Sequence, residues 1–270
     1  MAINDDVPCK SIPDIIYIIV FASLITCLAE HFVMKNGVAE FILNWGLVPA
    51  RLLENIDIHN VLTLFTHPFI HYLCPQYVMA DRQTHSVVEY YWLQLAITFT
   101  FLFIFGDNIE DRMGSLRFLI FCVVSDLIAS FTQIFYVPSM EMPIIGLSNL
   151  VSAILGAFVV SYPDAKLVTT HVLGRQQSYS FSARGIIILW FLWRTAPLFM
   201  PFLNSYILHP FMHLISPLAS NYSIGYILGS DLSTAEIMTP DCFGDLAGFA
   251  AGMLFVKLLE KKDLNSTSIK

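Results

Sequence analysis

The sequence predicts an all-α membrane protein, a bundle of six transmembrane helices with both ends of the chain on the same side. Three observations predict this class. Apolar residues make up 56% of the 270 residues and charged residues 13%, with a mean hydropathy of +0.66. A soluble domain carries about 45–50% apolar and about 25% charged residues. Apolar runs of about 20 residues, enough to cross a bilayer, recur along the chain. The Lys and Arg residues are also distributed unevenly among the loops.

Six apolar segments qualify as membrane spans, and the rest of the chain falls into loops and short ends. The predicted spans cover residues 13–34, 88–106, 115–136, 144–162, 184–204 and 241–258. Together they form one membrane domain over 13–258. A short polar segment (1–12) precedes this domain, and a basic polar tail (259–270) follows it.

The positive charges orient this bundle. With both ends on the cytosolic or matrix side, here called the near side, ten of the 14 Lys and Arg residues fall on that side. Lys35, Arg51 and Arg82 fall on the far side, and Arg194 lies within a span. Near-side loops of membrane proteins carry an excess of Lys and Arg, so this asymmetry supports the orientation. A bacterial inner membrane and a mitochondrial inner membrane fit it equally well.

Composition also argues against other kinds of partner. The net charge of −7 leaves no basic stripe, so we expect no nucleic-acid partner. The five cysteines follow no CxxC spacing. His209 and His213 have the spacing of a metal pair but no evident third ligand, so we expect no metal and no other cofactor.

Two far-side loops are long, at 37–87 and 205–240. The first contains the apolar stretch VLTLFTHPFIHYL, which is too short to cross a bilayer. We expect this stretch to lie in the membrane interface or to re-enter the membrane.

Small residues recur every four positions in the fourth and sixth predicted spans. They are Ser148, Ser152 and Gly156 in the fourth span, with the further small residue Gly146 two positions before them, and Gly244, Gly248 and Gly252 in the sixth. In lipid, small residues let two helix backbones approach closely. We therefore expect these two helices to pack against each other.

These two spans also carry an ordered set of motifs. The fourth reads GLSN at 146–149, then LVSAILGAFVV, then Tyr162 and Pro163. The sixth reads DLAGFAAG at 245–252. Further segments of the set are LFTHPFIH (64–71), FGDNIEDRMGSLRFL (105–119) and ILWFLW (188–193). This set resembles the rhomboid family of intramembrane serine proteases, whose fourth helix carries GxSG and whose sixth carries His-x-x-Gly-x-x-x-Gly. The resemblance covers residues 13–258 and implies a six-helix rhomboid-like bundle.

The sequence departs from the rhomboid pattern where that family does its chemistry. The resemblance places the nucleophile at Ser148, but the histidine that acts as general base is replaced by Asp245. The helix-two histidine and asparagine that help to hold the oxyanion are replaced by Gln94 and Thr98. The second glycine of GxSG is replaced by Asn149. The resemblance therefore implies a catalytically inactive member, a pseudoprotease.

The chemistry of serine and aspartate supports the same expectation. A serine hydroxyl is a weak nucleophile unless an adjacent base takes its proton. An ionised aspartate is a weak base, and a protonated one cannot accept a proton. We expect Ser148 to serve packing, and Asp245 to bond to Ser148 or to water entering from the far side. Asp126 and Arg194 are further ionisable residues in spans, where we expect a polar pocket. For Arg194, pairing with a carboxylate and binding of a lipid headgroup are the alternatives.

We expect the protein to bind other membrane proteins or their transmembrane helices, besides lipid. It would do so as an assembly, quality-control or translocation factor, or as a permanent subunit of a membrane complex. The alternative is an unusual intramembrane serine protease that uses Ser148.

Overall fold

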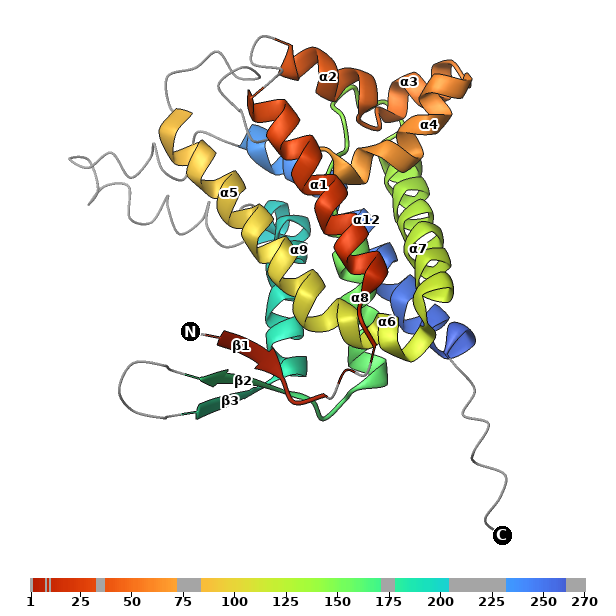
Figure 1. Ribbon diagram of the computed structural model, residues 1–270. Helices are drawn as coiled ribbons and strands as arrows, with labels where there is room; N and C mark the ends of the chain where they lie inside the picture. The colour runs from red at the N-terminus through yellow and green to blue at the C-terminus, as the bar shows by residue number, and fades with distance from the viewer. Residues whose placement is uncertain are drawn as a thin grey trace, which may run out of the picture.

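The computed structural model describes residues 2–7, 9, 11–32, 37–71, 84–170, 178–203 and 232–260 (Figure 1). Most of them are helical. The helices are α1 (Asp14–Phe32), α2 (Val38–Trp45), α3 (Pro49–Glu54), α4 (Ile58–Thr66), α5 (Thr84–Phe101), α6 (Asp107–Met113), α7 (Ser115–Tyr136), α8 (Ser148–Ser161), α9 (Ala183–Leu203) and α12 (Leu232–Leu259). A 3-10 turn, η1 (His67–Phe69), follows α4, and a π-helical turn, η3 (Leu102–Gly106), joins α5 to α6.

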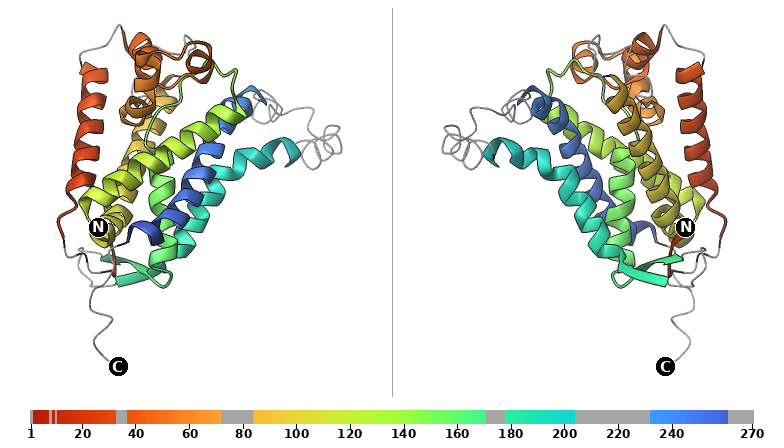
Figure 2. Two further views of the ribbon diagram at one scale, coloured as in Figure 1. Left: turned by 90° about the vertical axis from the view of Figure 1, so that its right-hand side faces the viewer. Right: turned by 90° about the vertical axis from the view of Figure 1, so that its left-hand side faces the viewer.

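Helix α8 forms the centre of the bundle. Its residues from Asn149 to Phe158 are all buried, because α7, α9 and α12 pack around it. A helix that is apolar on every face requires such surroundings. Its 14 residues span about 21 Å, which is less than the thickness of the hydrocarbon core. Figure 2 shows α1 along one edge of the bundle and α9 along the opposite edge.

The described residues contain three helices that are long and apolar enough to cross a membrane. They run over Leu93–Met113, Ser115–Tyr136 and Cys242–Leu259, and α8 is a shorter apolar helix. The predicted span 115–136 coincides with α7. The other predicted spans overlap α1, α5, α8, α9 and α12 with shifted ends. The count of six spans and the shared side of the two ends stay predictions.

A three-stranded antiparallel sheet lies at one end of the bundle, and the prediction of an all-α chain did not include it. Its strands are β1 (Ala2–Asp5), β2 (Lys166–Thr170) and β3 (Ser178–Ser182), in the order β1-β2-β3. The predicted polar segment 1–12 thus contains a strand, because Ala2 pairs with Thr170 and Asp5 with Leu167. Figure 1 places α6 and the end of α12 at this same end, which the charge distribution predicts to be the near side.

The first predicted loop forms α2, α3, α4 and η1, which cover the opposite end of the bundle (Figure 1). Backbone hydrogen bonds attach it to the segment before α8. Leu47 and Ile144 exchange two, of 3.1 and 2.8 Å, and the Gly146 N–H donates to the His67 carbonyl at 2.9 Å. Residues 72–83 of this loop, and 204–231 of the second with His209 and His213, lie outside the described residues.

Two buried carboxylates fasten the ends of α1. The Glu110 oxygens accept the N–H groups of Ile15 at 3.0 Å and Ile16 at 3.1 Å, where a helix start has unpaired donors. Near the other end, Glu30 of α1 accepts the N–H of His71 at 3.2 Å.

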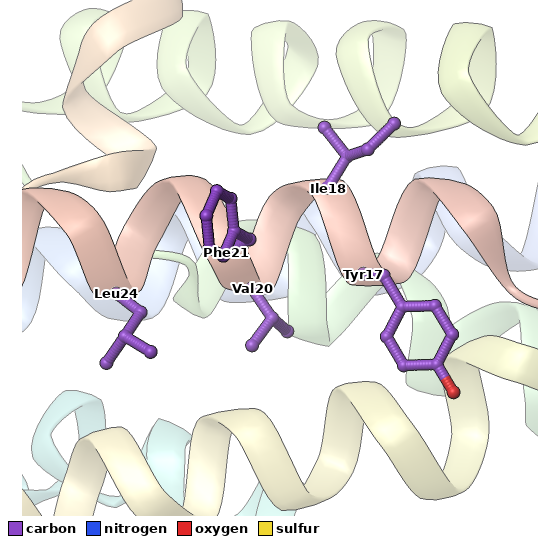
Figure 3. A pocket seen from close by; sticks show the side chains of 5 residues that line it. All are labelled: Tyr17, Ile18, Val20, Phe21 and Leu24. Carbon is purple, nitrogen blue, oxygen red and sulfur yellow. The ribbon is translucent and has the colours of Figure 1, made fainter.

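Between these two attachments α1 borders an apolar groove, shown in Figure 3. The groove is lined by Tyr17, Ile18, Val20, Phe21 and Leu24. Three of these side chains, Tyr17, Val20 and Leu24, point toward α5 in Figure 3.

Candidate functional site

Ser148 is the first residue of α8, and a glycine turn brings the chain to it. Gly146 has φ +93°, a left-handed conformation that glycine adopts without a steric penalty. Gly146 therefore makes the turn before α8, whereas the sequence placed it inside the packed helix. The Ser148 side chain is half-buried and makes no hydrogen bond within the described part of the chain. Its carbonyl oxygen accepts the hydroxyl of Ser152 at 2.9 Å.

Asp245 of α12 is fully buried, and both its carboxylate oxygens are engaged. Ser152 Oγ donates to Oδ1 at 2.8 Å, and Arg194 Nε of α9 donates to Oδ2 at 2.5 Å. The prediction of a hydrogen bond between Asp245 and Ser148 is therefore wrong. The serine that Asp245 contacts is Ser152, which lies one helical turn further along α8.

The contacts of Asp245 limit what it can do as a base. A general base must lie within hydrogen-bond reach of the hydroxyl that it deprotonates, about 2.6–3.2 Å. Asp245 meets this condition for Ser152 and not for Ser148. Its other oxygen accepts a hydrogen bond from the Arg194 guanidinium, so both oxygens are held by partners other than Ser148.

The same ion pair attaches α9 to α12. Two further contacts lie beside it. The Cys242 thiol of α12 donates to the Arg194 carbonyl at 2.9 Å, and the rings of Phe191 and Phe249 have centroids 4.7 Å apart. Polar and aromatic contacts thus join the two helices over the same turns.

Helices α8 and α12 pack backbone against backbone. A side chain at Gly252 would strike the carbonyl oxygen of Ala153, and one at Gly156 would strike that of Phe249. At Gly248 a Cβ atom would meet a carbonyl oxygen of α8 at 2.6 Å. The glycines in these positions allow the close approach that small residues give to membrane helices.

A family model of the Rhomboid domain matches residues 82–262, about two thirds of the chain. The chain belongs to the rhomboid family. The resemblance seen in the sequence is thereby confirmed, and the protein is a membrane protein with apolar helices. The match includes Ser148 and Asp245. No curated protein matches the chain.

The other positions that differ from the rhomboid motifs lie at the start of α8 and on α5. Asn149 is buried, and its side-chain amide donates to Gln133 Oε1 of α7 at 3.2 Å. Gln94 and Thr98 are half-buried on α5, which packs against α8. No hydrogen bond joins either of them to Ser148 within the described residues. An oxyanion site needs donors that converge on one point beside the nucleophile.

The two ionisable residues expected in a polar pocket lie in different sites of this rhomboid fold. Arg194 joins α9 to α12, as described above. Asp126 of α7 lies 3.4 Å from His67 Nε2, which is also 3.0 Å from the hydroxyl of Ser130. Asp126 therefore attaches the first loop to α7. Sequence reasoning missed the attachment made by Glu30, although a glutamate inside a predicted span was a signal for it.

Among the described residues outside the predicted spans, His71 is a predicted source of pH-dependent stability. Burial lowers the pKa of His71 from 6.5 to about 4. The unfolded chain therefore binds a proton at His71 at pH values where the folded protein does not. Stability should fall as the pH falls from 6.5 toward 4, by up to about 3 kcal/mol.

The measurement is thermal unfolding in detergent across this pH range for the wild type and for His71→Gln. The variant should lose the part of the pH dependence of stability that comes from protonation of His71 in the unfolded chain. His59→Gln, at an exposed position of the same loop, is the matched control and should keep it. If the unfolding temperatures of the wild type and of His71→Gln change equally with pH, His71 is not the source of this pH dependence.

Proposed function

We propose that this rhomboid protein has no protease activity and binds other membrane proteins through their transmembrane helices. The observation that carries the proposal is the engagement of Asp245 by Ser152 and Arg194, which keeps Asp245 from acting as the base for Ser148. Loss of a triad member removes about four orders of magnitude in rate. Replacement of the oxyanion residues by Gln94 and Thr98 lowers it further.

The binding site that we propose is the lateral opening between α5 and α9. These helices meet where the rings of Phe101 and Trp190 have centroids 6.1 Å apart. Further along, large apolar side chains on both helices are exposed, including Leu93 of α5 and Leu192 and Trp193 of α9. A partner helix lying there would cover these side chains, and van der Waals packing would hold it.

Site-specific cross-linking tests this location. A photoreactive amino acid at Leu93 or Trp193 should cross-link to transmembrane helices of other proteins in the native membrane. The same amino acid at Leu119, an exposed position on α7, is the matched control and should give only background. Equal cross-linking at all three positions would contradict a site between α5 and α9.

The role of such a complex can be read from its stoichiometry. Affinity purification in a mild detergent should recover the same partners from the wild type and from Ser148→Ala. Partners at a fixed ratio favour a permanent subunit, and variable ratios favour an assembly, quality-control or translocation factor. The charge distribution supports a bacterial or a mitochondrial inner membrane as the location.

The alternative function is an unusual serine protease, and the observation that favours it is that Ser148 still begins α8. A fluorophosphonate probe labels only an activated serine. We expect the wild type to label no more than Ser148→Ala does. Labelling lost only in Ser148→Ala, with intact proteins accumulating on that variant, would overturn the proposed inactivity.

A further inference from the structure

A hollow of about 500 Å³ lies on the near side, between β3 and the beginning of α9. This volume is in the range of small-ligand sites. Among the side chains that line it are two exposed cations, Lys166 of β2 and Arg184 of α9. Two hydroxyls, of Ser180 and Ser182, also line it. Cations together with hydroxyl donors are the groups that bind phosphate.

The backbone around the hollow adds to its positive character. Lys166 is paired in register with Ser182, so the Lys166 position lies beside the first turn of α9. Ser182 Oγ accepts the N–H of Gly185 at 3.3 Å, as an N-cap residue does. The amino end of a helix carries a partial positive charge. Asp164 is the carboxylate in the lining, and Asp6 nearby already accepts the backbone N–H of Lys166 at 2.8 Å.

The hollow lies at the end of the bundle where we expect the lipid headgroups. In Figure 1 strands β2 and β3 project sideways from the helices at this end. We therefore expect the sheet to extend along the membrane surface. Strand β3 alternates serines with Tyr179 and Phe181, whose side chains are half-exposed, at 50% and 53%. Exposed aromatic residues gather at the interface of membrane proteins, where their rings lie among the headgroups.

We propose that this hollow binds the phosphate headgroup of an anionic phospholipid in the near-side leaflet. Lys166 and Arg184 contact the phosphate, and Tyr179 and Phe181 hold the edge of the sheet in the interface. Anionic lipids attract basic residues close to the membrane surface, and the near side carries most of the positive charge of this chain.

Native mass spectrometry of the full-length protein tests the site. Protein purified in detergent is incubated with phosphatidylglycerol or with phosphatidylcholine, and retained lipid is counted. The wild type should retain phosphatidylglycerol preferentially. Lys166→Gln/Arg184→Gln should bind it about tenfold or more weakly, because two cation–phosphate contacts are lost. Arg117→Gln/Lys257→Gln removes the same charge at the same end of the bundle and should bind as the wild type does.

Three results would overturn the proposal. One is equal retention of the two lipids by the wild type, and another is equal loss of phosphatidylglycerol in both double variants. The third is displacement of the lipid by millimolar inorganic phosphate, which would identify a site for the free anion. Both double variants change exposed side chains, and their unfolding temperatures are measured alongside so that lost binding is not confused with lost folding.

Discussion

The Arg194→Leu variant is expected to lose about 3–5 kcal/mol of unfolding free energy, because it leaves the Asp245 carboxylate buried without its partner charge. Asp245 is fully buried, and Arg194 Nε lies 2.5 Å from its Oδ2. Ser152 supplies one hydrogen bond, which does not replace a guanidinium. The measurement is reversible unfolding in detergent, or thermal unfolding where unfolding is irreversible.

The matched control for this prediction is Arg194→Leu/Asp245→Leu, which removes both charges. Replacing a whole buried ion pair by apolar residues is often close to neutral, so this double variant should recover most of the lost stability. The two single variants and the double variant form a thermodynamic cycle that isolates the coupling. If the double variant is as unstable as the sum of the single variants, the two side chains do not interact.

The second large effect is expected from Gly252→Ala. The added Cβ would overlap the backbone oxygen of Ala153, so α12 and α8 must separate. We expect a loss of about 3 kcal/mol, the upper part of the range for overpacked sites, because a backbone cannot move aside as a flexible side chain does. Unfolding temperature in detergent measures it.

Gly185→Ala provides the comparison for Gly252→Ala, since both glycines lie in helices. Around Gly185 a Cβ atom would meet its nearest neighbour at 3.7 Å, an ordinary contact. That variant should be neutral or slightly stabilised, because alanine favours helix over glycine by about 1 kcal/mol. Similar losses in the two variants would show that backbone contact at Gly252 is not what limits stability.

The sequence predicts a helix well where the length of its apolar run determines where the helix begins and ends. Helix α7 coincides with the predicted span 115–136, because Gly114 ends the preceding helix and Pro138 follows. Helix α12 begins at Leu232, nine residues before the predicted start at 241, because hydropathy reports what crosses the lipid and not where the helix begins.

The place of β1 in the sheet escaped prediction because its pairing with β2 is not local, whereas β2 and β3 are neighbours in the sequence. Strand β1 has four residues, and its neighbour β2 begins at Lys166. Short strands that are far apart in sequence leave no hairpin signal. Periodicity and composition report neighbours along the chain, so they cannot reveal such a pair.

The candidate site could be predicted residue by residue but not contact by contact. The rhomboid motifs indicate Ser148 and Asp245 as candidate site residues. The free-energy cost of placing a charged side chain in lipid indicates Arg194. Whether Asp245 lies level with Ser148 or with Ser152 depends on how far α12 is shifted along α8. That shift depends on contacts between the two helices, such as that of Gly252 with the backbone oxygen of Ala153, and spacing within one helix does not encode it.

The carboxylate of Glu110 completes the amino end of α1 from 95 residues away. Translation produces α1 first, yet the acceptor for its first N–H groups is made only when the chain has grown past residue 110. Strand β1 can pair with β2 only after Lys166–Thr170 has been synthesised, which is later still. The part of the protein that is synthesised first is therefore the part whose docking is completed late. A nascent chain that ends before Glu110 therefore lacks the carboxylate that accepts the first N–H groups of α1.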